Sequence, residues 1–467
     1  MKHLITCFKC VTYVVFTVTL GCYRTAEETG ETGTETGTEA GPTETTTETE
    51  ETEETGTEVG PGETGTEVGP MEAETDSASV TTTDTGSELS SDTASADTGA
   101  SLPCENLEGY QDGAPWPTWQ GCPSRAGRSN VVGPKGATRA WVLPIREGEW
   151  IGDPVIGKDG TVYLAAQKSV VAITPDGSLE WEWFYDLSDP GAYHAPAIHR
   201  DGLVVVQAAR NGLMSALSLE GELIWQFAGE GYAYTHVLID SAGTIYGAND
   251  WGPNPVYESL FALDAAGNER WHQTAILGFK TAALAPDGDI VVSTNTEGGV
   301  YKYASEDGSV IWFSQVLMGL SPVSVAPSGN IYLCAGINTD YRLVALSPDG
   351  DLDWELSLDQ RCTSAPAIGA DDTIFVELDS ELWAVTKIGE FMWESPIPVE
   401  ASFNAGGPLI DGDETIYVVH KGLYAYDSDG NLLFEDPSEQ LIGSAALAAD
   451  GTLYVPGSDG RLYAFRD

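Results

Sequence analysis

The cysteines are the residues whose number and spacing point most directly to a chemistry. Of seven in the chain, Cys7 and Cys10 lie in an N-terminal segment of export-signal type, and Cys22 follows it. The remaining four are Cys104, Cys122, Cys334 and Cys362. An even number in an exported chain predicts two disulfides. In the repeated fold predicted below, Cys334 and Cys362 should lie on adjacent strands or on adjacent sheets (blades), with Cα atoms about 4.4–6.8 Å apart. Since no Cys-x-x-Cys pair or Cys/His cluster occurs beyond the N-terminal segment, we expect no metal site.

Histidines and acidic turns are the other candidates for catalysis or metal binding. The histidines beyond the N-terminal segment are dispersed and are expected at strand ends or in loops: His194, His199, His236, His272 and His420. Acidic turns such as Asp411–Glu414 and Asp427–Asn431 resemble fragments of Ca²⁺-binding loops, but they lack the distal glutamate of an EF-hand. No Gly-x-Ser-x-Gly, Walker or His-Glu-x-x-His motif occurs. We therefore predict no catalytic residue, no metal ligand and no cofactor.

Most of these residues belong to a pattern that the chain repeats eight times at intervals of about forty residues. Full copies of one phrase run from Ala172 through Gly177 to Trp181 and from Ala345 through Gly350 to Trp354. About twenty residues before each aromatic lies a second phrase, such as Asp159-Gly-Thr-Val-Tyr163. A period near forty residues, rich in strand and turn signals, indicates a propeller or a solenoid.

Each repeat is predicted to form short strands. Apolar runs such as Thr161–Ala165 and Ser169–Ile173 carry β-branched and aromatic residues, and Asp-Gly, Asn-Gly or Ser-Gly turns separate them. No sustained helical spacing of apolar residues occurs from residue 139 onward, so helices should be scarce. Four short antiparallel strands per repeat, arranged radially, is the plan of a β-propeller.

The two ends of the repeat region predict how the ring closes. The last repeat stops at Asp467 before any tryptophan, whereas Trp141 precedes the first complete repeat without a turn phrase of its own. We therefore predict an all-β, eight-bladed β-propeller with four-stranded blades, whose last blade takes an N-terminal strand; seven blades are the alternative. Eight aromatic residues should dock between blades: Trp141, Trp181, Trp225, Trp271, Trp312, Trp354, Trp393 and Phe434. The six tryptophans from Trp181 to Trp393 should be largely buried there.

The Ala-x-x-x-Asp-Gly-x-x-x-Trp phrase resembles the tryptophan-docking repeat of the pyrroloquinoline-quinone-like (quinoprotein-like) propellers. The preceding residues, from Trp116 to Pro134, are similar to the segment that often leads into the first blade of that family. The resemblance covers roughly Pro115 to Asp467 and implies an eight-bladed ring with a tryptophan wedged between neighbouring blades. The family includes quinone-dependent alcohol dehydrogenases and non-enzymatic members, among them an outer-membrane assembly lipoprotein, so the fold alone does not choose between them.

The resemblance also implies what an enzyme of this family should contain. Its dehydrogenases use a vicinal Cys-Cys disulfide over the quinone, a Ca²⁺ held by carboxylate and amide side chains, and an aspartate base. This chain has no adjacent cysteines, and it is shorter than those enzymes and lacks their long insertions between blades. We therefore expect a non-enzymatic, lipoprotein-type member.

The first hundred residues predict where the protein is located. Lys2 and Lys9 precede the apolar run Val11–Leu20, which is short for a membrane span and fits a secretory signal. Gly21-Cys22 resembles a bacterial lipobox, although Thr19 and Leu20 depart from its usual residues. We expect lipidation at Cys22, with ordinary signal cleavage as the alternative. Localisation should therefore be the bacterial outer membrane or cell surface, with periplasmic or secreted as the alternative.

Residues 25–100 are rich in Thr, Glu and Gly and contain no lysine or arginine, a low-complexity composition that cannot bury a core. The chain thus divides into a signal peptide (1–21), a disordered acidic stalk (22–100), a lead-in segment (101–138) and the propeller (139–467). The formal net charge of −51 excludes nucleic acid as a partner and leaves the lipid as the contact with a membrane.

Three functions fit these observations. The one we favour is a protein- or glycan-binding or scaffold module at the cell envelope, with a monomeric head. The alternatives are a divergent quinoprotein oxidoreductase and an outer-membrane protein assembly factor, the latter less consistent with a long stalk. A loop with Trp251 and Tyr257 is a possible ligand site, since exposed aromatics can stack on sugars or grip a partner.

Overall fold

A computed structural model describes residue 104 and residues 106–467, except for 187–190, 192–193, 211, 230, 234, 250–258, 275–277, 296–297 and 399–405. The predicted signal peptide and stalk, with Cys22, lie outside the described residues. So do Trp251 and Tyr257. In the part that is described, no helix is long and apolar enough to cross a membrane.

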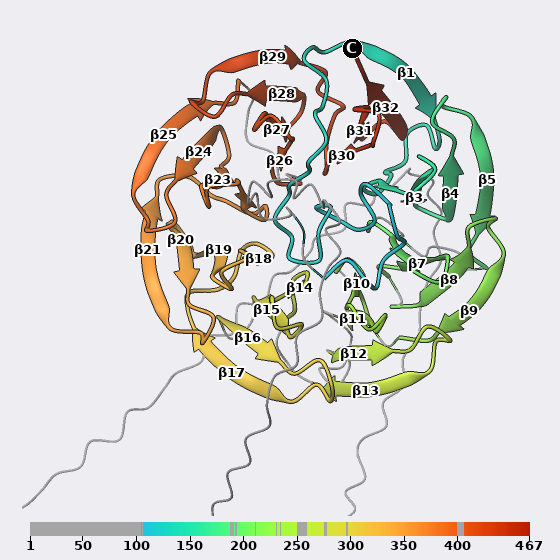
Figure 1. The fold of residues 1–467 in the computed structure, drawn as a ribbon, viewed down its shortest axis with the longest axis horizontal. Coiled ribbons are helices and arrows are strands. Elements are labelled where there is room, and N and C mark those ends of the chain that lie inside the picture. Colours follow the sequence, from blue (N-terminus) through green and yellow to red (C-terminus); the bar gives the residue numbers. More distant parts are fainter. Residues whose placement is uncertain are drawn as a thin grey trace, which may run out of the picture. The chain divides into compact units, whose positions relative to one another are not determined.

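The described chain forms eight four-stranded antiparallel sheets arranged as blades around a ring (Figure 1). This confirms the eight-bladed β-propeller, and the seven-bladed alternative is wrong. From the inner to the outer strand, the first four blades are β2 (Val155–Ile156), β3 (Val162–Ala166), β4 (Ser169–Ile173) and β5 (Leu179–Phe184); β6 (Ala197–His199), β7 (Leu203–Gln207), β8 (Met214–Ser218) and β9 (Leu223–Phe227); β10 (Leu238–Ile239), β11 (Ile245–Asn249), β12 (Ser259–Leu263) and β13 (Glu269–Thr274); β14 (Ala283–Leu284), β15 (Ile290–Thr294), β16 (Gly299–Tyr303) and β17 (Val310–Gln315).

The remaining four blades continue in the same order. They are β18 (Ser324–Val325), β19 (Ile331–Ile337), β20 (Asp340–Leu346) and β21 (Leu352–Leu358); β22 (Ala367–Ile368), β23 (Ile374–Glu377), β24 (Glu381–Val385) and β25 (Phe391–Pro396); β26 (Leu409–Ile410), β27 (Ile416–Val419), β28 (Leu423–Tyr426) and β29 (Leu432–Asp436); and β30 (Ala446–Leu447), β31 (Leu453–Pro456), β32 (Arg461–Phe465) and β1 (Arg139–Pro144).

The eighth blade is closed by the N-terminal strand, as the sequence indicated. Strand β1 pairs antiparallel with β32, so that Leu143 lies opposite Leu462 and Arg139 opposite Phe465. Figure 1 shows the C-terminus beside β1. Because β1 covers the outer edge of β32, the last blade has four strands like the other seven.

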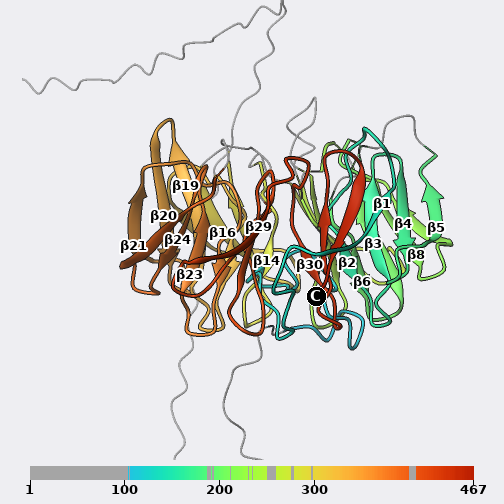
Figure 2. The same cartoon turned by 90° about the horizontal axis from the view of Figure 1, so that it is seen from above.

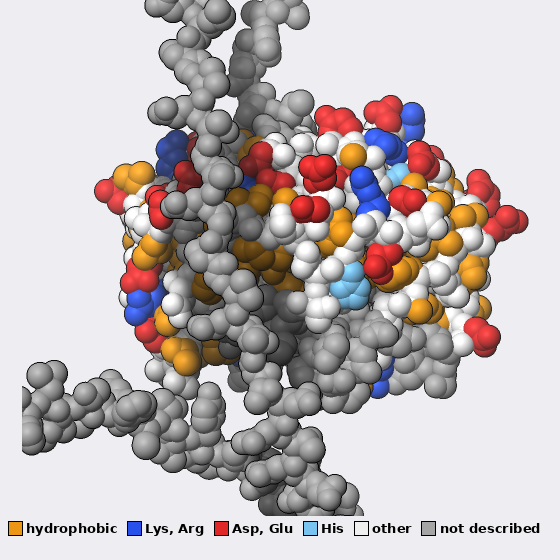
Figure 3. Space-filling view, turned by 90° about the horizontal axis from the view of Figure 1, so that it is seen from below, with side chains coloured by type: hydrophobic (Ala, Val, Ile, Leu, Met, Phe, Trp, Pro, Cys, Tyr) orange, Lys and Arg blue, Asp and Glu red, His pale blue; other side chains and the backbone are white. Residues whose placement is uncertain are grey.

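The strands differ in burial according to their place in a blade. All five residues of β3 and of β4 are buried, whereas β5 is exposed or half-buried throughout. Every outer strand also carries a register shift beside its docking aromatic, as between Ala172 and Ile173 opposite Trp181. Such β-bulges twist a strand edge away from other chains. The ring's rim mixes hydrophobic and acidic side chains (Figure 3).

The docking aromatics sit against glycines of the next blade. The ring of Trp225 lies over Gly267, where an added Cβ would come within 2.6 Å of the indole, and its Nε1–H donates to the carbonyl of Ala265 (2.9 Å). The same arrangement recurs in pairs that run round the ring: Trp141 with Gly177, Trp181 with Gly221, Trp271 with Gly308, Trp312 with Gly350, Trp354 with Gly389 and Trp393 with Gly430.

The burial of these aromatics differs from the expectation. Trp271 is buried, at 9% exposure, whereas the other seven are only half-buried. The reason is their position on the outermost strand, where one face covers the neighbouring turn and the ring edge stays at the surface. Phe434 lacks an indole N–H and packs, tilted, on Tyr417 at 6.3 Å between ring centroids.

Candidate functional site

The lead-in segment, residues 101–138, crosses the centre of the ring on one face (Figures 1 and 2). In an antiparallel blade, the turns after the first and third strands share one face, and the remaining connections share the other. The lead-in segment lies on the first of these faces, because Gly109 accepts from the amide of Arg200 and Val131 from that of Gly412, both in turns after inner strands. That face of the ring is therefore covered.

The covering segment is hydrogen-bonded to the inner strand of seven blades. In the first blade the amide of Ile156 donates to the carbonyl of Trp116, at 2.8 Å. At the equivalent position of the third blade, the amide of Ile239 donates to the hydroxyl of Tyr110, at 2.9 Å. The other five pairs are Ile198 with Pro117, Leu284 with Pro123, Val325 with Ser124, Ile368 with Ala126 and Ile410 with Gly127.

Arg125 fixes the middle of the lead-in segment. Its side chain is fully buried, and its guanidinium donates to the carbonyls of Ala282 (3.0 Å), Trp119 (2.8 Å) and Val237 (3.1 Å). It also lies 5.7 Å from the centroid of the Trp119 ring, in a cation–π contact. Burial lowers the pKa of Arg125 to about 10. The guanidinium therefore remains charged at neutral pH and stabilises this part of the segment through carbonyl oxygens.

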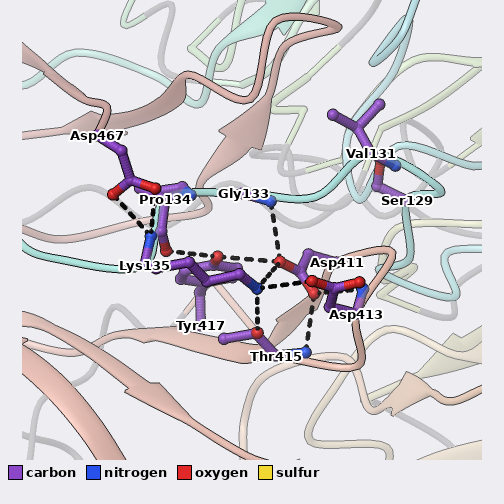
Figure 4. A network of polar contacts seen from close by, with 10 residues as sticks. All are labelled: Ser129, Val131, Gly133, Pro134, Lys135, Asp411, Asp413, Thr415, Tyr417 and Asp467. Carbon is purple, nitrogen blue, oxygen red and sulfur yellow. Dashed lines mark hydrogen bonds and ion pairs between the residues drawn. The ribbon is translucent and has the colours of Figure 1, made fainter.

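A second anchor holds the end of the lead-in segment against the seventh blade (Figure 4). The buried carboxylate of Asp411 accepts from the amide of Gly133 (2.9 Å) and from the hydroxyl of Tyr417 (3.1 Å). Lys135 lies 3.3 Å from the same carboxylate, and its own amide donates to the side chain of Asp467, at 2.9 Å. This acidic turn, which resembled a fragment of a Ca²⁺ loop, thus binds the protein's own backbone.

On the inner side of the lead-in segment, Trp119 meets residues that directly precede inner strands. Its ring is stacked on His236, with centroids 4.4 Å apart and an angle of 4°. His194 packs edge-on against His236, at 5.2 Å. Asp153 and Ser444 complete a set that we call the inner cluster: Trp119, Asp153, His194, His236 and Ser444. Asp153, His194 and His236 remain partly accessible to solvent.

Hydrogen bonds define the state of the two imidazoles. Nδ1 of His236 accepts from the amide of Ala195 (3.0 Å), so its proton is on Nε2. Nε2 of His194 lies 3.0 Å from the carbonyl of Ala233 and donates to it, which makes Nδ1 the acceptor. Burial lowers the pKa of His194 to about 4 and, with His194 and Arg125 nearby, holds the pKa of His236 well below its usual value. Both rings are therefore neutral at physiological pH.

The acidic side of the cluster is arranged around Ser444. Its amide donates to Oδ1 of Asp153 (2.7 Å), and its hydroxyl accepts from Nε1–H of Trp119 (2.7 Å). The same hydroxyl donates to the carbonyl of Gly406, at 3.0 Å. Burial raises the pKa of Asp153 to about 6. The Ser444 hydroxyl thus lies between the indole of Trp119 and a backbone carbonyl.

The inner cluster corrects one expectation from the sequence. The histidines looked dispersed, yet His194 and His236 lie together, because each precedes the inner strand of its own blade. Aligning the repeats on the inner strands would have placed Asp153, His194 and His236 on one side of the ring. Trp119 carries no such signal, since it lies outside the repeats. Among the described residues, no group of three or more His, Cys, Asp or Glu side chains is placed to bind a metal ion.

The remaining described histidines lie outside the inner cluster. His420 lies 2.6 Å from Glu377, and both side chains are buried between the sixth and seventh blades. At equivalent positions across the ring, Gln207 donates to Asn249 at 3.1 Å between the second and third blades. His199 is buried against the carbonyl of Gly243, and His272 is exposed on β13.

The predicted disulfides are both present. Cys104 is bonded to Cys122, with Cα atoms 5.4 Å apart, and this bridge closes the lead-in segment on itself. Cys334 on β19 is bonded to Cys362, which precedes the inner strand of the next blade, with Cα atoms 5.8 Å apart. The second bridge therefore joins the fifth and sixth blades, at the distance expected from the sequence.

No protein-family model matches the chain, and no curated protein matches it in sequence. Among solved structures, BamB from Moraxella catarrhalis has a TM-score of 0.55 at 15% identity, covering 71% of this chain and 97% of that chain. The computationally designed Ika8 protein has a TM-score of 0.57 at 10% identity, over 70% and 99% of the two chains. The Dos1 propeller has 0.57 at 9% identity, over 70% and 96%. At such identities the likeness shows the fold alone, and the chain is a β-propeller.

Proposed function

We propose that the protein is an exported, lipid-anchored propeller that binds a protein or glycan ligand at the bacterial cell envelope. The observation that carries the proposal is the asymmetry of the ring. The lead-in segment covers one face with hydrogen bonds to seven blades, whereas the inner cluster, on the side of the connections between blades, keeps three polar side chains partly accessible. A ligand therefore binds from the side of those connections.

The chemistry of the inner cluster supports an uncharged, polar ligand. The two neutral imidazoles supply one donor, Nε2–H of His236, and one acceptor, Nδ1 of His194, and Asp153 adds a carboxyl group. Hydroxyl and amide groups match such a set, as in a sugar or a peptide backbone. Trp119 is not a stacking platform for sugars, because His236 covers one side of its ring and Arg125 contacts it as well.

Binding is favoured over quinone chemistry by the cysteines. A planar quinone needs a flat sandwich and a cation at its polar edge. The two disulfides join residues that are 18 and 28 positions apart, so neither provides the vicinal pair that covers the quinone in the dehydrogenases this repeat resembles. The outer-membrane assembly role of one family member gains no specific support from the inner cluster.

The proposal is tested by affinity capture with the immobilised lead-in segment and propeller. Envelope extract is applied to the wild type and to His194→Ala, His236→Ala and the control His272→Ala, which lies on the outer strand β13. Bound protein and carbohydrate are then identified. We expect the two inner-cluster variants to lose capture and His272→Ala to retain it, with circular dichroism showing that all three variants are folded. Capture that survives both inner-cluster changes would refute this site.

Lipidation is tested separately in cells. Metabolic labelling with a radioactive fatty acid should label the full chain and not Cys22→Ser. Unlabelled wild-type protein released into the medium would favour ordinary signal cleavage instead.

A further inference from the structure

A hollow of about 740 Å³ lies on the face that the lead-in segment covers. Its apolar lining comes from the lead-in segment itself and includes Leu107, Ala114, Pro115, Pro117 and Val131. The volume falls within the range of about 300–1,000 Å³ that is typical of ligand pockets. The hollow is separate from the inner cluster, none of whose residues lines it.

The hollow has neighbours from three blades. Arg200, which lines it, follows the inner strand β6 of the second blade. Asn106, also in the lining, donates to the carbonyl of Ala285 in the fourth blade (3.2 Å). Arg128 in the lining is paired with Glu414 of the seventh blade (2.8 Å). The hollow therefore lies against Arg200 of the second blade and beside lead-in residues that are bonded to the fourth and seventh blades.

Cys104 determines which part of the chain is nearest to this hollow. It lines the hollow, and its bond to Cys122 holds it there. Consecutive Cα atoms are about 3.8 Å apart, so Pro103 and Leu102 begin within reach of the lining. Leu102 is the first side chain larger than valine since Leu89, and the residues between them are small or polar. A leucine and a proline match the apolar lining.

We propose that residues 97–103 dock in this hollow, with Leu102 and Pro103 against Leu107, Pro115 and Val131. The segment that leads into Cys104 is then held on the covered face. The docking itself does not depend on the proposed function, but its consequence for ligand binding does. The preceding chain would join the ring on the face away from the inner cluster, which leaves the ligand side clear.

Hydrogen exchange with mass spectrometry tests the docking on the mature chain. We expect amides of residues 97–102 to exchange at least ten-fold more slowly than those of residues 85–91, which serve as an internal reference. Leu102→Asp and, from the other side of the contact, Val131→Asp should each abolish this protection. Leu89→Asp is the matched control, because it places the same change in the preceding segment, and it should leave the protection intact.

A photo-crosslinking residue at position 102 identifies the occupant. Intramolecular crosslinks to residues 107–131 are expected, and none from the same residue at position 89. Crosslinks between two chains would assign the hollow to a second copy and overturn the proposal, as would exchange of residues 97–102 at the reference rate. Ligand capture by the inner cluster is measured on the unmodified chain as well. In that chain, absent capture with protected residues 97–102 would refute the proposed function alone, and absent protection with intact capture would refute the docking alone.

Discussion

Replacing Gly267 by alanine measures how strongly a docking tryptophan joins two blades. Gly267 has a φ of +81°, and an added Cβ would lie 2.6 Å from Cδ2 of Trp225. The left-handed conformation alone costs an alanine about 1–2 kcal/mol. Displacing the indole adds the cost of overpacking, about 1–3 kcal/mol, and weakens the Nε1–H bond to Ala265, which is worth about 0.5–1.5 kcal/mol.

Gly288 provides a matched control for the backbone cost. Its φ is +86°, and an added Cβ would meet nothing within 4 Å. Gly288→Ala should therefore cost about 1–2 kcal/mol, and Gly267→Ala should cost about 1–3 kcal/mol more. The free energies of unfolding are measured by urea denaturation followed by circular dichroism.

A double mutant isolates the contact between the two residues. In a Trp225→Ala background the indole is absent, so Gly267→Ala should cost no more than Gly288→Ala does. Equal costs for the two glycine changes in the wild-type background would refute the reasoning, because they would show that the packing of the Trp225 indole does not require a glycine at position 267. An unchanged excess in the Trp225→Ala background would refute it as well.

Three further predictions concern closure, pH and cofactor chemistry. Deleting residues 138–143 removes β1, so size-exclusion chromatography should show aggregation; an equally stable monomer would contradict the closure. Burial raises the pKa of Asp153 to about 6, so the protonated side chain stabilises the folded protein by about 1–3 kcal/mol below pH 4. This stabilisation is lost as the pH rises through 6. In Asp153→Asn the free energy of unfolding, measured by urea denaturation, should depend less on pH between 4 and 6. An unchanged dependence on pH would contradict this prediction. Added Ca²⁺ and pyrroloquinoline quinone should give no dye-linked alcohol oxidation; substrate-dependent turnover would restore the oxidoreductase hypothesis.

The repeat made the fold predictable, because each copy contains the same strand and turn signals. Gly177 and Trp181 recur at a fixed spacing since seven of the eight blades stack a tryptophan on a glycine of the neighbouring blade, and Trp141 revealed the closing strand because it had no blade of its own. The burial of the aromatics was overestimated, because the spacing does not show how much of each ring the neighbouring turn covers.

The inner cluster was less predictable for a physical reason. His194 and His236 are far apart in the sequence and meet because two inner strands start side by side around an axis. Trp119 and Arg125 belong to a segment without repeats, so no periodicity places them. In the sequence Arg125 looks like an ordinary surface charge; its burial depends on carbonyl oxygens that the ring brings together.

The closing strand also sets the order in which the molecule can assemble. The partners of β1 and of the end of the lead-in segment lie in the last two blades, as the pairing of Arg139 with Phe465 shows. These residues of the lead-in segment and β1 must therefore remain unpaired until the ribosome has made the seventh and eighth blades. Joining ends that are more than 300 residues apart costs about 5 kcal/mol of chain entropy, a cost that shrinks when the blades between them are already stacked. Until β1 pairs with it, β32 has an unpaired outer edge, so the eighth blade is the one most exposed to pairing with a strand of another protein.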